Sequence, residues 1–192
     1  MLLAASGFAD VKAEAVCQQD VLFCTDEELM TGTGRNTFSP DRPMTRAMVV
    51  TVLWRMAGSP EVTEKAAFTD VASGSYYEAA VAWAAKNEIA SGTSATTFEP
   101  NKAVTREPLA KFLFNYAVYQ GMEAVTLSEN LSSFADHDTV SGYAVPAMQW
   151  ACGSGMVTGQ KQASGMILDP QGTTTRAQMA TMMMRFCAEI AK

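Results

Sequence analysis

The residue pair Thr-Arg occurs three times at the start of an apolar helical pattern, at Thr45-Arg46, Thr105-Arg106 and Thr175-Arg176. A cation in the first turn of a helix is disfavoured by about 0.3–1 kcal/mol, because the helix dipole places partial positive charge there. First-turn N–H groups, the positive end of the dipole and a guanidinium can together bind one anion. The planar fork of arginine suits a carboxylate, since it can bond to both oxygens. The pattern therefore predicts up to three related sites for a negatively charged group.

An internal role for the three arginines is the alternative. Each guanidinium could pair with an acidic side chain, such as the aspartate of a neighbouring Phe-x-Asp motif, and act as a structural strut. The two roles are compatible. The threonines have a separate explanation, because a threonine at a helix N-cap accepts a hydrogen bond from a first-turn N–H group. Only Thr175 is followed by the glutamine of a capping box, Gln178.

The three pairs belong to an internal repeat. A shift of 60 positions aligns Phe8-Ala9-Asp10-Val11 with Phe68-Thr69-Asp70-Val71, and Phe38-Ser39-Pro40 with Phe98-Glu99-Pro100. A third copy, which begins at Phe134-Ala135-Asp136, follows with small insertions. We expect the aspartates of the Phe-x-Asp motifs to cap the first helix of each copy or to brace an arginine; these are Asp10, Asp70 and Asp136.

Each repeat is predicted to be a helix, a loop and a second helix. The apolar spacing is helical in 75–92 and from Thr105 to Tyr116, and Gly92 is expected to end the first helix or to form a left-handed turn. A pair of short helices cannot bury its apolar faces alone, so the three units should share a core. We expect closure about a pseudo-threefold axis rather than an open solenoid. The predicted segments are 1–7 (an N-terminal remnant or tag edge), 8–60, 61–120 and 121–192 (a linker and the third repeat).

Composition narrows the classes of function. Of the 192 residues, 48% are hydrophobic and 18% charged, which indicates a folded chain. The net charge is −6 and no cluster of Lys or Arg is visible, so we expect no nucleic-acid partner. No apolar stretch reaches the ~18 residues of a membrane span, so we expect none. The carboxylates recur beside turns with no nucleophile and base around them, so we expect no catalysis.

The cysteines and the histidine do not form a metal motif. No C-x-x-C occurs and His137 is the single histidine, so neither a metal nor a cofactor is expected. We expect free and mostly buried thiols, although three disulfide pairings remain open. The four cysteines are Cys17, Cys24, Cys152 and Cys187.

The ordered motifs resemble the S-layer homology (SLH) module, and three copies are the usual number in that family. The second copy is the nearest match, with Phe68-Thr69-Asp70-Val71, Tyr77, Ala80-Val81-Ala82-Trp83-Ala84, Ile89, Gly92, Phe98-Glu99-Pro100 and Thr105-Arg106. The resemblance covers nearly the whole chain. It implies an all-α fold in which three helix-loop-helix modules form a pseudo-threefold prism around a central three-helix bundle.

The resemblance also implies a function. Grooves between SLH modules bind secondary cell-wall polysaccharide, often through a pyruvate-ketal sugar, and so hold a protein on a bacterial cell wall or S-layer. By matching, the ligand-binding residues would be Arg46, Arg106 and Arg176, with Gly32, Gly92 and Gly159 letting the backbone approach the sugar. We therefore expect an extracellular, noncatalytic anchoring module, which is a monomer.

The chain departs from the family pattern at one position in every copy. The family often reads Thr-Arg-Ala-Glu, but the fourth position is Met48, Pro108 or Gln178 here. We expect grooves of unequal affinity, with one or two competent. The second hypothesis is a protein-interaction module that kept the fold but lost the sugar sites.

Overall fold

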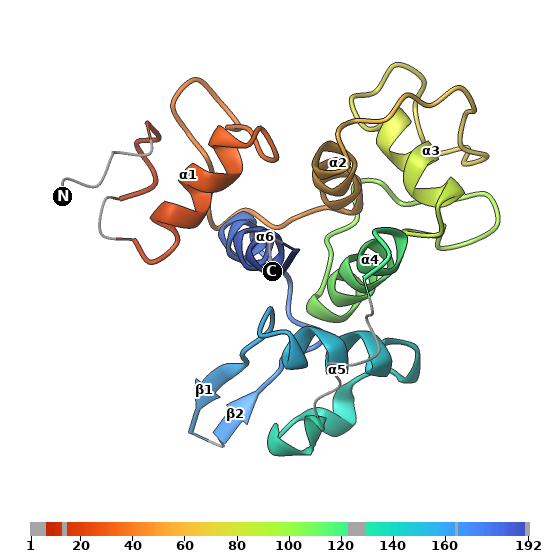
Figure 1. Cartoon of the computed structure of the whole chain (residues 1–192). Coiled ribbons are helices and arrows are strands. Elements are labelled where there is room, and N and C mark those ends of the chain that lie inside the picture. The colour runs from red at the N-terminus through yellow and green to blue at the C-terminus, as the bar shows by residue number, and fades with distance from the viewer. Residues whose placement is uncertain (1–6, 13–14, 123–129, 164, 191–192) are drawn as a thin grey trace. The chain divides into compact units, whose positions relative to one another are not determined.

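A computed structural model of the chain describes residues 7–12, 15–122, 130–163 and 165–190 (Figure 1). These residues divide into two compact units, which we describe separately. The first unit holds the residues up to Met44 together with those from Thr174 onward, and the second holds Thr45–Thr173. The compact units therefore cut across the predicted sequence repeats. Residues 1–6 of the expected remnant and residues 123–129 of the predicted linker lie outside the described residues.

Most of the secondary structure is helical, in agreement with the expected class. The first unit contains α1 (Gln18–Asp26) and α6 (Arg176–Ile190). The second unit contains four α-helices, three short 3-10 helices and one hairpin, namely α2 (Arg46–Met56), α3 (Glu78–Lys86), α4 (Arg106–Tyr119), η1 (Leu131–Ser133), η2 (His137–Thr139), η3 (Gly142–Ala144), α5 (Val145–Gly153), β1 (Gln160–Gln162) and β2 (Gly165–Ile167).

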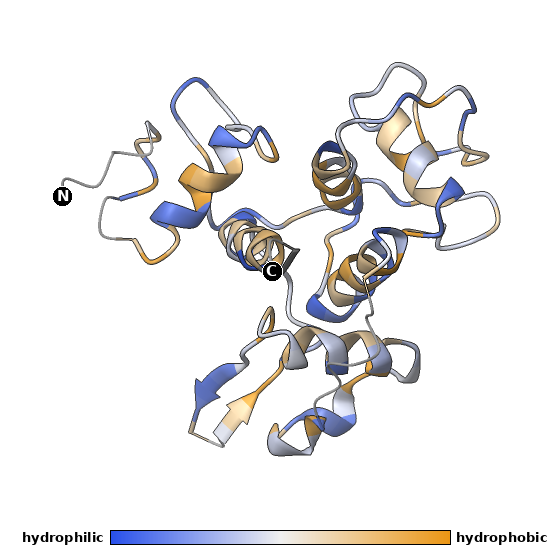
Figure 2. Cartoon of the chain, in the orientation of Figure 1, coloured by the Kyte–Doolittle hydropathy of each residue, from blue (hydrophilic) through white to orange (hydrophobic). Residues whose placement is uncertain are grey.

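The short hairpin differs from the expected all-α content. Strands β1 and β2 pair antiparallel, with Gln160 opposite Ile167 and Gln162 opposite Gly165. They form in the longer loop of the third repeat, where residues added between the first helix and the Leu-Asp-Pro element are enough for a ladder. Figure 2 shows that β1 is hydrophilic along its length, so this hairpin is a surface addition to a helical unit.

Helix packing links each repeat to the next one in sequence. Within the second unit, α2 packs on α3 and α4 packs on α5, and α2 also contacts α4. Within the first unit, α6 packs on α1. The second helix of each repeat therefore lies against the first helix of the following repeat, and the last helix returns to the first. The pseudo-threefold prism and its central bundle stay predictions.

Buried side chains confirm most of the expected apolar faces. Trp83 and Trp150 are buried in the first helices of repeats two and three, as predicted. The faces of the second helices are buried as well, except for a partly exposed Met56. These buried residues are Val49, Val52, Leu53, Leu109, Phe112, Leu113, Tyr116, Met179, Met182, Met183 and Phe186.

The four cysteines are free thiols, as predicted. Cys24 and Cys152 are buried, whereas Cys17 and Cys187 are partly exposed. The Cys24 thiol donates to the carbonyl of Ala180 in α6. Burial raises the pKa of Cys24 to about 12, so this thiol acts as a small apolar group in the core.

The left-handed turn after the first helix is not formed by Gly92. Glu28 and Glu88 take this conformation in the first two repeats, with φ of 55° and 57°, and Gly155 takes it in the third with φ of 72°. The prediction for Gly92 was therefore wrong. The helix stops earlier, at Lys86, and the left-handed residue lets the Ile89 N–H bond back to the Ala84 carbonyl.

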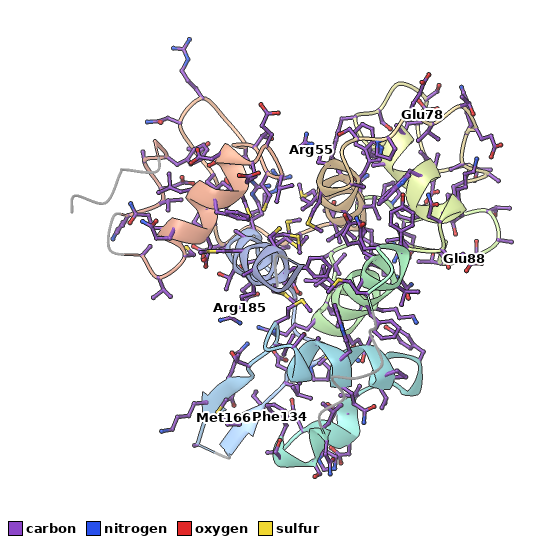
Figure 3. The ribbon with its side chains drawn as sticks, in the orientation of Figure 1. Arg55, Glu78, Glu88, Phe134, Met166 and Arg185 are labelled. Atoms are coloured by element: carbon purple, nitrogen blue, oxygen red, sulfur yellow. The ribbon has the colours of Figure 1, made fainter. Side chains whose placement is uncertain are left out.

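The phenylalanine of each Phe-x-Asp motif packs against the loop glycine of the same repeat. A Cβ atom on Gly92 would lie 2.5 Å from Cε1 of Phe68 and 2.6 Å from the carbonyl oxygen of Thr97. Gly32 meets Phe8 in the same way, and Gly159 meets Phe134. Figure 3 shows Phe134 close to Met166 of the hairpin. These glycines thus have an internal packing role, and their contact with a sugar stays a prediction.

Replacing the crowded glycine should destabilise the fold. We expect Gly92→Ala to lower the free energy of unfolding by about 1–3 kcal/mol, because the added methyl group overpacks the Phe68 contact. Urea denaturation of the purified chain measures the change. Gly142→Ala is the matched control, since a Cβ atom there meets nothing within 4 Å. Equal stability of Gly92→Ala and Gly142→Ala would contradict the packing role.

Candidate functional site

Arg46, the first of the three predicted arginines, is held in place by internal contacts. Its side chain is buried; Nε donates to the Phe98 carbonyl at 2.7 Å and Nη2 donates to the Ser91 carbonyl at 2.6 Å. The guanidinium carbon lies 4.5 Å from the ring centroid of Phe98, which is a cation–π distance. Burial lowers the pKa of Arg46, while Glu99 and Asp70 act in the opposite direction, and the group remains a cation at neutral pH.

Arg176 makes the equivalent contacts in the first unit. Its Nε donates to the Phe38 carbonyl at 2.7 Å and Nη2 donates to the Thr31 carbonyl at 2.6 Å. The guanidinium carbon lies 4.3 Å from the Phe38 ring centroid. Arg46 and Arg176 therefore each hold the loop that precedes the Phe-x-Pro turn of the next repeat. All four bonds go to backbone carbonyls, whereas the internal role predicted for these arginines was pairing with an acidic side chain.

Arg106 differs from the other two. Its Nη1 atom lies 2.5 Å from Oδ2 of Asp169 and also donates to the Asp169 carbonyl at 3.2 Å. The acid belongs to the Leu-Asp-Pro element rather than to a Phe-x-Asp motif. The internal ion pair that we weighed as an alternative is therefore present in this copy.

Sequence differences between the second and third repeats explain why Arg106 forms an ion pair with an acid. In the second repeat Glu99 is paired with Lys102, whose Nζ lies 2.7 Å from its carboxylate. The residue in register with Lys102 in the third repeat is Gly172, which provides no cation. Leu168 stands where the other repeats have phenylalanine, so the ring that lies against Arg46 and Arg176 has no counterpart at this position.

The first-turn amides of the second helices are occupied, which corrects one element of the predicted anion site. The Arg46 N–H donates to the Lys102 carbonyl and the Ala47 N–H donates to the Pro100 carbonyl. Arg106 and Arg176 make the corresponding bonds, to Gly172 and Arg42. These loops satisfy the amide donors because each helix begins against the turn of the next repeat. An anion at these positions would therefore bind to side chains rather than to free helix amides.

The threonine caps follow the prediction in two copies. Thr45 accepts from the Met48 N–H at 3.3 Å, and Thr175 forms a reciprocal capping box with Gln178. Thr105 makes no side-chain capping bond in the described chain. The reason is the residue three positions on, Pro108, which has no N–H to donate.

The Phe-x-Asp aspartates do not cap the first helices, so the capping alternative was wrong, whereas the alternative that they brace an arginine stays a prediction. Asp70 accepts from the Phe98 N–H at 2.8 Å and from the Glu99 N–H at 2.7 Å. Asp10 and Asp136 bind the two corresponding amides of their own repeats. The central residue of each Phe-x-Pro turn has positive φ, 57° at Glu99. The carboxylate thus stabilises a left-handed turn that a side chain rarely adopts.

A pocket of about 560 Å³ opens beside Arg46 within the second unit. Its lining includes two further cations, Lys102 and Lys111, and the predicted Gly92. No acidic residue stands among the described residues that line it. Of the predicted site residues, Arg46 and Gly92 are therefore brought together here, and Arg106 contributes instead to the ion pair with Asp169.

The other pocket-lining residues mix apolar and hydrogen-bonding groups. They are Ile89, Ser91, Thr93, Ala103, Val104, Thr105, Pro108, Phe112, Asn115, Tyr143 and Gln171. Apolar surface beside a few polar groups and cations is the usual make-up of a ligand site.

A buried acid positions one wall of this pocket. Glu107 is 3% exposed and accepts from the Ser141 N–H, the Ser141 hydroxyl and the Tyr143 hydroxyl, at 3.0, 2.8 and 3.2 Å. Burial raises the pKa of Glu107, but these bonds and one from Gln171 outweigh it and hold the pKa below its usual value. Burial and the nearby Glu107 raise the pKa of Tyr143 to about 12, so its hydroxyl stays protonated.

Sequence reasoning missed Lys102, Lys111, Glu107 and Tyr143. Lys102 offered a signal, since the aligned copies place Arg42, Lys102 and Gly172 at one position. Lys111 and Glu107 lie in α4 of the second repeat, and Tyr143 of the third repeat joins them only through the packing of α4 against that repeat.

Comparison with known proteins points to a surface module. Residues 7–47 and 67–107 each match the model of the S-layer homology domain. The chain carries two tandem matches to this domain. Each match begins just before a Phe-x-Asp motif and ends just after a Thr-Arg pair. The third repeat stays a prediction, supported by its equivalent Asp136 and Arg176 contacts.

The relatives include a surface-layer protein and proteins named as an endoglucanase and an amylopullulanase. The chain is 29% identical to the Surface-layer 125 kDa protein of Lysinibacillus sphaericus over 91% of its length and 14% of the relative. It is 28% identical to an Endoglucanase of Bacillus sp. (strain KSM-635) over 90% of its length and 18% of the relative. An Amylopullulanase of Thermoanaerobacterium thermosulfurigenes is 28% identical over 74% of the chain and 7% of the relative. The chain thus spans less than a fifth of each of these proteins.

The comparisons support cell-surface anchoring in general. The domain matches and the surface-layer relative indicate a bacterial cell-wall or S-layer location. Within the described residues, every helix is too short or too polar to cross a bilayer.

Removing the charge of Asp70 should weaken the Phe-x-Pro turn. Burial raises the pKa of Asp70, but the bonds from Phe98 and Glu99 outweigh it and lower the pKa below its ordinary value. The stabilisation is therefore present above the unfolded pKa and is lost as the pH falls through the lower folded pKa. We expect Asp70→Asn to lower the free energy of unfolding by about 1–2 kcal/mol at pH 7, with a smaller difference near pH 2–3.

Urea denaturation at several pH values tests this expectation. Asp138→Asn is the control, because Asp138 is an exposed acid of the third repeat. A difference between Asp70→Asn and the wild type that stays constant from pH 7 to pH 2 would show that the carboxylate charge is not responsible.

Proposed function

We propose that this chain anchors its protein noncatalytically to a bacterial cell wall by binding an anionic, pyruvylated secondary cell-wall polysaccharide. The binding site is the pocket beside Arg46. The observation that carries the proposal is the convergence of Arg46, Lys102 and Lys111 on one cavity whose described lining holds no acid. Lys102 is paired with Glu99, which does not line the cavity, and Arg46 and Lys111 add further positive charge, so the site favours a ligand with fixed negative charge.

Arg46 retains donors for such a ligand. A guanidinium has five N–H donors, and two of them are used on the carbonyls of Phe98 and Ser91 within the described chain. The remaining three donors are available to a carboxylate that enters the pocket. Because the two internal bonds hold the guanidinium plane, little side-chain entropy is lost when an anion binds.

A pyruvate-ketal sugar fits the mixed chemistry of this lining. Its carboxylate suits the three cations, and its methyl group and the sugar ring suit Phe112, Val104 and Ile89. Asn115, Gln171 and Tyr143 can form hydrogen bonds with sugar hydroxyls. The pocket draws on all three repeats, since Arg46, Lys102 and Tyr143 come from different ones.

A protein-interaction module without sugar binding is the second candidate. The observation that favours it is the use of Arg106 by Asp169, which leaves this arginine on an internal acid. A pull-down separates the two candidates. Purified wall sacculi should retain the chain, and sacculi stripped of pyruvyl groups should not. Equal retention by both preparations would contradict the carboxylate-based proposal, and sugar release from the polymer would revive an enzymatic function.

Reversing one pocket charge should reduce binding without disturbing the core. We expect Lys111→Glu to weaken binding of a pyruvylated disaccharide at least 10-fold, because it replaces an attractive cation with a repelling anion. Arg46→Lys should weaken binding by about 10- to 100-fold, since it loses the fork but retains a charge. Titration calorimetry measures both.

The control for these variants is Lys161→Glu, which makes the same charge change at an exposed position of β1. Its affinity should stay within twofold of the wild type. Unchanged binding in Lys111→Glu and in the triple variant Arg46→Ala, Arg106→Ala, Arg176→Ala would rule out the arginine sites.

A further inference from the structure

We infer that Asp169 and Gly172 set the number of ligand molecules that this chain binds. Asp169 occupies Arg106 in place of a ligand carboxylate, and Gly172 leaves the space that this contact needs. The inference rests on the proposed function for the Arg46 pocket. It assigns to these two residues the role of closing a second, equivalent site.

The backbone around Arg106 has the arrangement found around Arg46. Thr105 forms an isolated antiparallel β-bridge with Thr173, and Thr45 forms the same kind of bridge with Ala103. The Arg106 and Glu107 amides bind the carbonyls of Gly172 and Pro170, as the Arg46 and Ala47 amides bind those of Lys102 and Pro100. The two arginines therefore start from equivalent positions at the head of a helix. The two arginines therefore differ in their contacts because the neighbouring side chains differ, and not because the backbone differs.

The side chain of Arg106 forms an ion pair with Asp169, whereas the bonds of Arg46 go to backbone carbonyls. Arg46 lies over a phenylalanine ring and binds two carbonyls, whereas Arg106 forms the 2.5 Å ion pair with Asp169. The Arg106 side chain is only 13% exposed, so this pair is shielded from water on one side. A carboxylate already bound to Nη1 competes directly with the carboxylate of a ligand, since both need the same donors.

Gly172 is required for this contact. A Cβ atom on Gly172 would overlap both Oδ2 of Asp169 and Nη1 of Arg106. The second repeat has Lys102 at this position, and its ammonium group binds Glu99 and so removes that acid from competition for Arg46. Gly172 thus lacks both the side-chain bulk and the positive charge with which Lys102 keeps Arg46 available to a ligand.

Titration calorimetry with a synthetic disaccharide that carries a pyruvate ketal tests the inference. We expect Asp169→Ala to bind one more equivalent of the disaccharide than the wild type. The double variant Asp169→Glu, Gly172→Lys recreates the Glu99–Lys102 pair and should gain the same equivalent. Adding Arg106→Ala to Asp169→Ala should remove it. Asp138→Ala, an exposed acid of the same repeat, is the control and should keep the wild-type stoichiometry.

The reactivity of Arg106 towards phenylglyoxal, mapped by mass spectrometry, tests the ion pair without any sugar. Arg106 should react at least several-fold faster in Asp169→Ala than in the wild type, and at the wild-type rate in Asp138→Ala. Unchanged reactivity of Arg106 would overturn the inference.

The outcomes separate this inference from the proposed function. Wild-type binding with no added equivalent in either Asp169 variant overturns the inference and leaves the Arg46 pocket standing. Binding by Asp169→Ala alone overturns the Arg46 pocket and supports the inference. Absence of binding in every form overturns both. Retention of the first equivalent in the variants also reports that they are folded.

Discussion

Each repeat depends on a Phe-x-Pro turn, or on Leu-Asp-Pro in the third repeat, whose backbone is held from two sides. The aspartate of the same repeat binds two amides of the turn, as Asp70 binds those of Phe98 and Glu99. The arginine of the preceding repeat binds carbonyls of the same loop, as Arg46 binds those of Phe98 and Ser91. Donors and acceptors of one strained turn are thus both satisfied by charged side chains. The arginine of the proposed ligand site is also a residue that joins two repeats.

This arrangement explains why a cation stands in the first turn of a helix. The cost of placing Arg46 near the positive end of the dipole is of the order of 0.3–1 kcal/mol. Two charge-assisted bonds to carbonyls and a cation–π contact contribute more than this. The structural and the binding roles are therefore compatible, because the internal bonds use two donors and orient the others.

The repeat, the helical class, the buried tryptophans and the capping box at Thr175 and Gln178 could be predicted because they depend on spacing and local chemistry. The left-handed residue could not, because Glu88 rather than a glycine takes that conformation where packing ends the helix. The missing cap at Thr105 was predictable, since Pro108 has no N–H. The ion pair of Arg106 and the pocket wall at Tyr143 depend on how repeats meet. No pattern within one repeat reports such contacts.

The pairing of α6 with α1 has a consequence for how the chain reaches its native state. Cys24 and its partner Ala180 are 156 positions apart, so the first repeat cannot cover its apolar helix until α6 has been synthesised. Contacts of such long range slow folding, because a large loop must close before they form. The nascent first repeat therefore exposes Val21 and its neighbours for longer than the middle repeat exposes its own core. We expect aggregation or capture by a chaperone in that interval.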